Sequence, residues 1–449
     1  MGERRCVTDS GANDRFVGEC SDPAYRRNSK ENHVDRSAHD RAVPVRATPT
    51  HHVFVPEDPP MTAVIGAVLE RSGAPAPYAR STPITVSDLE LDPPGPEEVL
   101  VRIAAASVCH SDLSTVDGSR PRRTPLVLGH ESAGTVVSVG HRVEDVAQGD
   151  HVVLVFLPRC GTCEACLADS GRPCIPGSVA NGEGRLLSGE RRLHRDGHPL
   201  DHHLGVSGFA THAVVHRSSV VRIDDDVPFE VAAMLGCAVL TGGGAVVNAA
   251  APAPTDTIAV VGLGGVGMAA VMTAAALGVR RVVAVDTASD KLALALTLGA
   301  TAASTPDEAV GQGERFDIVI EAAGRARAFD TAFELTAPGG NTVTVGLPDP
   351  SERSLISPLV LTAEARRITG SYLGNAVPSR DIPFFERLWR EGRLPVERLI
   401  SSRIPLSQIN EAMDSLREGR ALRQVIVLDH LVPPLATPTT AHPRQESAS

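Results

Sequence analysis

The segment Ile258-Ala-Val-Val-Gly262-Leu-Gly264-Gly265-Val266-Gly267 joins an apolar run to an alanine-rich stretch that continues to Leu277. The apolar run is typical of a buried strand, and the alanine-rich stretch is typical of a helix. A Gly-x-Gly-x-x-Gly between them permits a tight turn and lets the backbone approach a pyrophosphate. The pattern therefore predicts a dinucleotide site at the helix N-terminus, where unpaired N–H groups favour an anion. The alternative is a glycine turn that only packs a helix against a sheet.

The residues that follow alternate between strand-like and helix-like patterns. A second apolar run at 281–285 precedes a helical pattern at 289–298, and a third run spans 316–320. Strands that alternate with helices predict a parallel, doubly wound sheet. Asp286 ends the second run, where an acid would accept hydrogen bonds from the adenosine ribose and repel a 2′-phosphate. Lys291 is placed to hold the same ribose, so the expected cofactor is NAD. The expected loop contacts are Gly262, Gly264, Gly265, Val266 and Gly267.

The chain divides into segments of different character. Short β-branched runs separated by turns between 99 and 155 indicate a β-rich region, and a last strand is expected at 424–428. The ends of the chain are too polar or too rich in proline to form a core, and we expect them to be disordered. The expected segments are a leader at 1–60, a β-rich catalytic domain at 61–237, a dinucleotide domain at 238–372, a return to the catalytic domain at 373–431 and a tail at 432–449. A further hypothesis is that the leader is not native, because a strand-like pattern begins just after Met61.

Half of the eight cysteines lie close together at metal-ligand spacing. Four closely spaced thiolates suit a closed tetrahedral Zn²⁺ that stabilises a loop and leaves no position for substrate. An iron–sulfur centre is the alternative, although it usually has a different spacing. Disulfides are a weaker interpretation, because nothing in the sequence suggests export. The expected ligands of this structural zinc are Cys160, Cys163, Cys166 and Cys174.

A second set of metal-ligating residues is dispersed along the chain. Cys109 begins Cys-His-Ser-Asp, His130 lies in Gly-His-Glu, and Cys237 precedes the dinucleotide domain. Two thiolates and one imidazole, with a fourth position open for water or substrate, are typical of a catalytic zinc. Asp112 is expected to accept a hydrogen bond from the far ring nitrogen of His130, and Glu131 to lie just behind the metal. Taken singly, each cysteine is as well explained as a core residue.

Composition excludes several classes of partner. The net charge of −11 argues against a nucleic-acid partner, since phosphate binding needs a basic surface. We find no apolar run of transmembrane length and expect no membrane partner; the most apolar stretch, 258–286, is interrupted by glycines. The N-terminus has no apolar core of the kind that a secretory signal needs. The expected location is therefore the cytoplasm.

Together these motifs resemble the zinc-containing alcohol dehydrogenases of the medium-chain dehydrogenase/reductase superfamily, in the same order and over essentially all of 61–430. The resemblance implies an α/β protein with a GroES-like β-rich catalytic domain and a Rossmann domain with a doubly wound parallel sheet. It implies two zinc ions per chain and hydride transfer between an alcohol and NAD. The long segment between Cys174 and Val214 resembles that of the long-loop, dimeric, class III-like members, which implies a homodimer. Its many histidines are expected to be solvated loop residues rather than further ligands.

The resemblance also implies roles for individual residues. Ser111 would pass the alcohol proton outward through the cofactor ribose. His110 and Arg423 would lie near the pyrophosphate, and Phe156 would line the substrate pocket. Many relatives carry His where this chain has Ser114, and serine is no base near neutral pH, so water or His110 would have to complete the relay.

Three functions are consistent with this pattern. The first is a zinc-dependent, NAD-linked dehydrogenase that converts a primary or secondary alcohol to an aldehyde or ketone. The second is a formaldehyde dehydrogenase acting on a thiol adduct; Arg120 and Ser178 depart from the residues of glutathione-dependent relatives and argue against glutathione as the thiol. The third is a catalytically silent protein that binds NAD and zinc. The sequence does not identify the alcohol.

Overall fold

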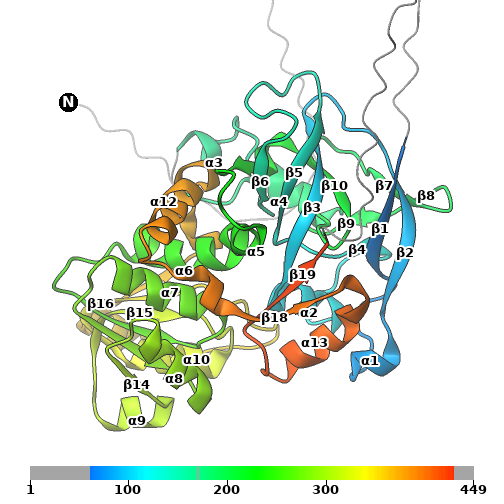
Figure 1. Ribbon diagram of the computed structural model, residues 1–449. Helices are drawn as coiled ribbons and strands as arrows, with labels where there is room; N and C mark the ends of the chain where they lie inside the picture. The colour runs from blue at the N-terminus through cyan, green and yellow to red at the C-terminus, as the bar shows by residue number, and fades with distance from the viewer. Residues whose placement is uncertain (1–60, 169–170, 429–449) are drawn as a thin grey trace, which may run out of the picture. The chain divides into compact units, whose positions relative to one another are not determined.

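The computed structural model of the protein describes residues 61–168 and 171–428 (Figure 1). The expectations about residues 1–60 and 432–449, and the two cysteines at 6 and 20, lie outside the described residues. The described residues belong to one compact unit, and the metal and dinucleotide motifs all lie in it.

The segment after residue 256 forms the parallel sheet that the sequence predicts. Its six strands run in the order β14-β13-β12-β15-β16-β17, and every neighbouring pair is parallel. The strands are β12 Thr257–Val261, β13 Arg281–Val285, β14 Ala302–Ser304, β15 Phe316–Glu321, β16 Thr336–Thr344 and β17 Arg367–Gly370. The order reverses between β12 and β15, and such a switch point is where doubly wound sheets bind ligands.

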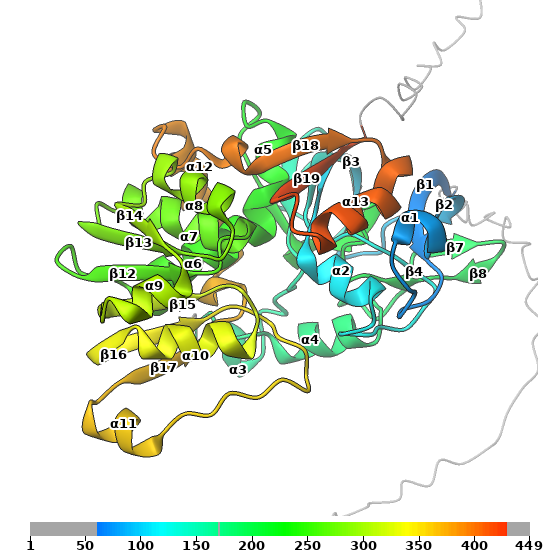
Figure 2. The same ribbon diagram turned by 90° about the horizontal axis from the view of Figure 1, so that it is seen from below.

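Helices cover both faces of this sheet (Figure 2). They are α7 Gly265–Ala276, α8 Ser289–Thr297, α9 Pro306–Gly311 and α10 Ala326–Glu334, with α11 Pro358–Ala363 before the edge strand. Alternate residues of β12 belong to different apolar clusters: Ile258 and Val260 are in the cluster that contains Met268 of α7, whereas Val261 is in the one that contains Ala309 of α9. A strand buried on both faces explains the continuous apolar run in the sequence.

The β-rich region consists of two further sheets. One contains β1 Thr62–Leu69, β2 Ile84–Leu91, β4 Leu126–Val127, β7 Leu193–Arg195, β8 His198–Pro199 and β9 Asp201–His202. The other contains β3 Glu98–Val108, β5 Ser132–Val139, β6 His151–Leu154, β10 His212–His216, β11 Val220–Arg222, β18 Ile400–Ile404 and β19 Arg423–Val427. The helices of this region are α1 Tyr78–Ser81, α2 His110–Val116, α3 Glu164–Leu167 and α4 Ile175–Gly182.

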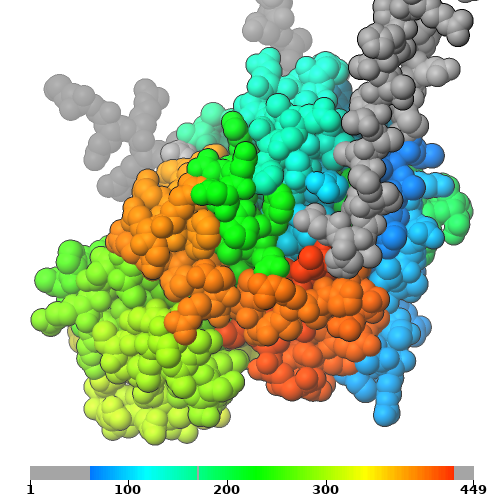
Figure 3. Space-filling view, in the orientation of Figure 1, coloured from blue at the N-terminus to red at the C-terminus, as the bar shows by residue number. Residues whose placement is uncertain are grey.

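The C-terminal segment runs back from the Rossmann sheet to the β-rich region. It contains α12 Pro378–Arg390 and α13 Ile409–Arg417, and β19 pairs antiparallel with β3. The Asp414 carboxylate of α13 accepts hydrogen bonds from the backbone N–H groups of Tyr78 and Ala79 at 2.7 and 2.9 Å, which caps α1. Figure 3 shows this segment, in orange and red, lying between the yellow-green and blue parts of the chain. The last strand of the described chain therefore completes a sheet that is otherwise formed largely by residues 98–222.

A single apolar helix, Phe229–Ala250, connects the two regions. It consists of α5 Phe229–Met234, a π-helical segment Leu235–Val239, α6 Leu240–Gly244 and a second π-helical segment Ala245–Ala250. Its length and composition would allow it to cross a membrane, so the expectation that no apolar run reaches transmembrane length is wrong. However, 83% of its apolar window is buried inside the protein. A core helix has the same properties, and this one packs against α7 and α12.

Candidate active site

Three chain segments bring the dispersed metal-ligating residues together. Cys109 follows β3 and caps the N-terminus of α2, His130 follows β4, and Cys237 lies in the π-helical segment of the connecting helix. Gly236 allows this helix to approach β6, because a Cβ there would lie 2.6 Å from the Leu154 carbonyl oxygen. One ligand atom from each of Cys109, His130, Cys237 and Glu131 lies within 4.8 Å of the others, and all four side chains are buried.

The donor set fits a zinc ion. A hydrogen bond from Cys237 lowers the pKa of the Cys109 thiol well below its usual value, which favours the thiolate that binds metals. The His130 Nε2 atom lies 3.7 Å from the Cys237 Sγ atom, so both face the same space. Both oxygens of the buried Glu131 carboxylate lack a hydrogen-bond partner, and Oε1 lies 3.5 Å from an Arg423 guanidinium nitrogen. Two sulfurs and one imidazole leave an open position of the catalytic kind.

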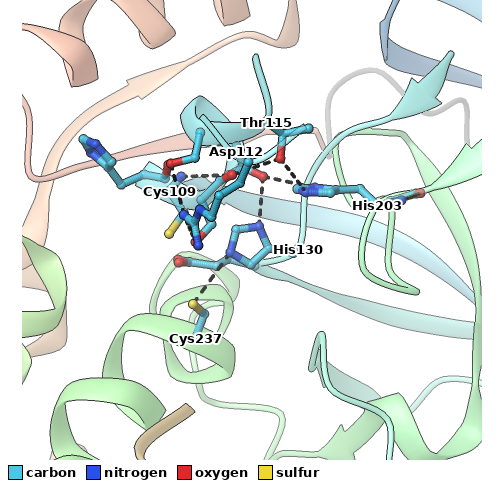
Figure 4. A network of polar contacts seen from close by, with 12 residues as sticks. Cys109, Asp112, Thr115, His130, His203 and Cys237 are labelled. Atoms are coloured by element: carbon cyan, nitrogen blue, oxygen red, sulfur yellow. Dashed lines mark hydrogen bonds and ion pairs between the residues drawn. The ribbon is translucent and has the colours of Figure 1, made fainter. Parts of the chain in front are cut away.

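Asp112 orients the histidine of this donor set (Figure 4). Its Oδ1 atom lies 2.9 Å from His130 Nδ1, which is the contact that the sequence predicts. Its Oδ2 atom accepts a hydrogen bond from the Cys109 backbone N–H at 2.9 Å. The Nδ1–H tautomer leaves Nε2 free to bind a metal. One carboxylate therefore fixes the positions of two metal-ligating residues.

The expectation that the histidines of the long segment are solvated is wrong for three of them. His202, His203 and His212 are buried, whereas His198 is exposed. The reason is that the segment folds into the short strands β7, β8 and β9 and leads into β10, and these pairings place alternate side chains inside. His203 lies beside the candidate metal site, with its Nδ1 atom 3.3 Å from Asp112 Oδ1. No motif in the sequence marks this residue.

The four closely spaced cysteines form a second donor cluster. The sulfur of Cys163 lies 3.5 Å from that of Cys166 and 3.9 Å from that of Cys174, and the Cys160 and Cys166 sulfurs are 4.0 Å apart. Tetrahedral Zn–S bonds of about 2.3 Å place sulfurs about 3.8 Å apart, so the spacing fits one zinc ion. Backbone N–H groups of Cys160 and Gly177 point at the Cys174 sulfur at 3.3 and 3.4 Å. Such donors stabilise thiolates, and four sulfurs leave no open position.

The first turn of α2 presents its side chains to a cleft of about 400 Å³ beside the metal-ligating residues. His110, Ser111, Ser114, Arg120 and Phe156 line it together with Cys109 and Cys237. The Arg120 guanidinium donates a hydrogen bond to Ser114 Oγ at 3.0 Å and lies 3.5 Å from Ser111 Oγ. Ser114 stands where many relatives carry His, and its hydroxyl oxygen already accepts a hydrogen bond from Arg120.

The glycine loop forms the other end of the same cleft. Gly264 caps the N-terminus of α7, and a Cβ there would contact nothing within 4 Å, which leaves room for a ligand against the backbone. Gly267 serves packing instead, because its Cβ would lie 1.8 Å from the Gly262 carbonyl oxygen. Gly262 itself has a φ of 93°. These are the distinct roles that the dinucleotide fingerprint assigns to its glycines.

Two charged residues flank this loop. The Asp286 carboxylate accepts hydrogen bonds from the backbone N–H groups of Leu263 at 2.7 Å and Ala288 at 3.0 Å, which holds it at the edge of the cleft. Lys291 lines the cleft nearby. Arg423 of β19 is almost fully buried between the metal-ligating residues and the loop, and a Cβ on Gly265 would lie 2.6 Å from its Nε atom. One cleft thus extends from the metal-ligating sulfurs to Asp286.

This combination of a buried thiolate–imidazole donor set and a doubly wound dinucleotide sheet defines a metal-dependent dehydrogenase. Residues 95–225 match the alcohol dehydrogenase GroES-like domain, and residues 265–388 match the zinc-binding dehydrogenase domain. The chain belongs to the zinc-containing alcohol dehydrogenase family of the medium-chain dehydrogenase/reductase superfamily, and it is an oxidoreductase.

Two relatives each match 78% of the chain. Alcohol dehydrogenase D of Mycobacterium tuberculosis is 37% identical over 360 residues, which are 78% of this chain and 98% of the relative. The NDMA-dependent alcohol dehydrogenase of Amycolatopsis methanolica is 35% identical over 360 residues, which are 78% of this chain and 97% of the relative. Among solved structures, benzyl alcohol dehydrogenase from Acinetobacter calcoaceticus has a TM-score of 0.75 and 28% identity, covering 82% of this chain and 99% of that one.

Proposed function

We propose that the protein is a zinc-dependent, NAD-linked alcohol dehydrogenase that interconverts a primary or secondary alcohol with its aldehyde or ketone. The observation that carries the proposal is the single cleft shared by Cys109, Cys237, Gly264 and Asp286. It supports a reaction in which a metal-held alcohol and a dinucleotide meet between the two ends of one cleft. The proposal includes one catalytic and one structural zinc per chain.

The chain's own residues would divide the chemistry between them. Cys109, His130 and Cys237 would hold the catalytic zinc, and Cys160, Cys163, Cys166 and Cys174 the structural one. When bound, zinc supplies a Lewis acid for the alcohol oxygen and the nicotinamide accepts the hydride.

Ser111 would relay the alcohol proton: its hydroxyl oxygen accepts this proton while its own hydroxyl proton passes outward, so Ser111 is not the final base. Ser114 cannot be the final base either, because a serine hydroxyl is not basic near neutral pH. The path beyond Ser111 therefore ends on water or on His110, which lines the same cleft.

The preference for NAD rests on the charge of Asp286. The carboxylate is fixed by two backbone N–H groups at the end of β13, where it would accept hydrogen bonds from the ribose hydroxyls and repel a 2′-phosphate. A similar structure from Sinorhizobium meliloti, of 25% identity and TM-score 0.66, was solved with NADP, and one from E. coli, of 22% identity, was solved with NADH, so structures of this fold are found with either cofactor. The preference is tested by comparing NAD with NADP for the wild type and for Asp286→Asn.

The wall of the pocket supports an alcohol with an apolar or aromatic body. Phe156 packs edge-on against His130, with ring centroids 5.4 Å apart, and against Tyr372 at 6.0 Å. Leu204 and Leu347 line a small cavity together with His130, Phe156 and Tyr372. A relative named for benzyl alcohol has the same fold. Benzyl alcohol is therefore the first substrate to test.

The deciding experiment measures NADH formation with benzyl alcohol and a panel of primary and secondary alcohols. The assay is run with and without NDMA, because one relative is named as an NDMA-dependent alcohol dehydrogenase. Zinc content is measured on the same sample. Turnover with about two zincs per chain, lost on chelation, supports the proposal. Full zinc content without turnover of any free alcohol contradicts it. Turnover of thiol–formaldehyde adducts alone would then favour the adduct dehydrogenase, and no turnover at all would favour the silent protein.

A further inference from the structure

Two arginines lie at the pocket where the alcohol would bind. Arg120 and Arg122 line a small cavity of about 50 Å³ together with the zinc-ligand candidate His130 and the aromatic residues Phe156 and Tyr372. Arg120 also lines the larger cleft that contains Cys109. Both guanidinium groups thus border the space beside the candidate metal site.

The hydrogen bonds of these arginines are all to neutral groups. Arg120 donates to Ser114 Oγ at 3.0 Å, and Arg122 donates to the Asn181 carbonyl oxygen at 3.1 Å. Across residues 61–168 and 171–428, no carboxylate forms an ion pair with either one. The neighbouring Arg123 differs: it is exposed, and it pairs with Asp201 at 3.4 Å. The two pocket arginines therefore bring positive charge that no carboxylate of the described residues pairs with directly, although the buried Asp112 acts on Arg122 and Asp117 lines the same cleft as Arg120.

Burial and mutual repulsion raise the free energy of these two positive charges. Arg122 is half-buried, and burial together with the nearby charge of Arg120 lowers the pKa of its guanidinium. Two like charges held close together at the edge of an apolar cavity repel each other and lose part of their hydration. An anion between them offsets both costs, and a carboxylate accepts two parallel hydrogen bonds from one guanidinium.

We propose that the substrate is an alcohol or aldehyde that carries a carboxylate, and that Arg120 and Arg122 bind this carboxylate while the reacting carbon lies at the candidate zinc site. This inference rests on the proposed function and names its substrate class. The apolar wall formed by Phe156, Tyr372 and Leu204 contacts the body of the molecule between its two polar ends. The pyrophosphate of the dinucleotide has its own site at the N-terminus of α7, so it does not account for these arginines.

The test compares a homologous series of ω-hydroxycarboxylates, and 4-(hydroxymethyl)benzoate, with uncharged alcohols of the same length and with benzyl alcohol. The measured quantity is the ratio of kcat/KM for each acid to that for its uncharged partner. We expect acids of one length to be preferred, and Arg122→Gln to lower this ratio by about 10- to 100-fold, mainly through KM. Arg120→Gln is expected to lower the same ratio. The matched control Arg123→Gln removes a charge from the outer surface and should leave the ratio unchanged.

Three outcomes overturn the inference. One is a preference for the uncharged alcohol at every length. Another is an equal loss for acid and uncharged alcohol in Arg122→Gln, which indicates a structural role. A preference for phosphorylated alcohols over the carboxylates, lost in the same variants, would also overturn it, because the anion would then be a phosphate.

Failure of the proposed function is distinguishable from failure of this inference. If no alcohol is turned over, titration calorimetry of 4-(hydroxymethyl)benzoate and benzyl alcohol against the zinc-loaded protein still measures binding. Tighter binding of the acid, weakened in Arg122→Gln but not in Arg123→Gln, keeps the anion site while the dehydrogenase activity is rejected. Equal affinity for both compounds, or the same affinity in the wild type and Arg122→Gln, rejects the site.

Discussion

The Nδ1 atom of His203 lies 3.3 Å from the Oδ1 atom of Asp112, the same oxygen that contacts His130. The Nε2 atom of His203 lies 3.5 Å from Thr115 Oγ1, so the ring is held on both sides. The Asp112 carboxylate is fully buried, and two imidazoles and a backbone N–H surround it. His203, which comes from a segment distant in the sequence, therefore helps to hold the Asp112 carboxylate that orients the candidate zinc ligand His130.

Asp112→Asn should weaken the catalytic zinc. The substitution keeps the shape of the side chain but removes the charge that fixes the His130 tautomer, and such changes typically lower metal affinity about 10- to 100-fold. His203→Phe should have a smaller effect, because it leaves the Asp112–His130 contact in place. Zinc affinity is measured by competition with a chelator, and the four-cysteine site serves as an internal reference. Equal affinity in Asp112→Asn and wild type would refute the role of Asp112.

Cys166→Ser should remove one zinc per chain and leave the other. The four sulfurs hold their loop through the metal, so its loss should lower the free energy of unfolding by about 3 kcal/mol or more. Metal analysis and thermal unfolding measure the two effects. Ser178→Ala, on an exposed turn of α4 close to this site, is the control and should change neither. Unchanged zinc content in Cys166→Ser would show that the cluster is not a four-cysteine zinc site.

Ser111→Ala should lower kcat by about 100-fold or more, because the alcohol proton loses its first acceptor. Zinc content and NAD affinity should remain those of the wild type, since Ser111 is not a ligand in the proposed site. Ser111→Thr keeps a hydroxyl and should recover part of the activity. Wild-type turnover in Ser111→Ala would exclude the relay.

Gly264→Ala should lower NAD affinity, whereas Gly267→Ala should lower stability. A Cβ at Gly267 would lie 1.8 Å from a backbone oxygen, so this variant should lose about 1–3 kcal/mol of stability or more. A Cβ at Gly264 would project into the cleft without a neighbour, so this variant should fold normally and bind NAD more weakly. Urea unfolding and NAD titration separate the two. Normal NAD affinity in Gly264→Ala would place the pyrophosphate elsewhere.

Stability should fall in mild acid because of buried histidines. Burial lowers the pKa of His212 from 6.5 to about 4 and that of His202 to about 3. Protonation therefore favours the unfolded chain: the stability is fully present above the ordinary pKa of 6.5 and is lost as the pH falls through that value toward 4. Each histidine contributes a slope of about 1.4 kcal/mol per pH unit in this window.

The variant His212→Gln tests this pH dependence. Urea unfolding across the window should give a shallower slope for His212→Gln than for the wild type. His198→Gln changes an exposed ring and should keep the wild-type slope. Identical slopes in all three proteins would contradict the assignment.

The sequence predicts the parts of this protein that depend on local pattern. The apolar run before Gly262 and the alternation after it are enough to predict the parallel sheet, and ligand spacing is enough to predict the Asp112–His130 contact. His203 could not be found in this way, because its segment is polar and its burial depends on strand pairs of only two or three residues. Arg120 is marked in the sequence only as a departure from relatives. Its hydrogen bond to Ser114 depends on how the chain turns after α2, which side-chain periodicity does not encode.

The run Gly242-Gly243-Gly244 in the connecting helix has a mechanical consequence. Added Cβ atoms there would lie 2.0 Å from the Val266 carbonyl oxygen, 2.5 Å from the Phe385 ring and 2.6 Å from the Gly374 carbonyl oxygen, so this part of the helix packs closely against α7 and the C-terminal segment. Cys237, fewer than two turns away on the same helix, follows Gly236, which packs just as closely against β6 of the β-rich region. A metal ion bound by Cys237, Cys109 and His130 would therefore cross-link this helix to the segments that follow β3 and β4, and its removal would weaken that connection as well as abolish the Lewis acid.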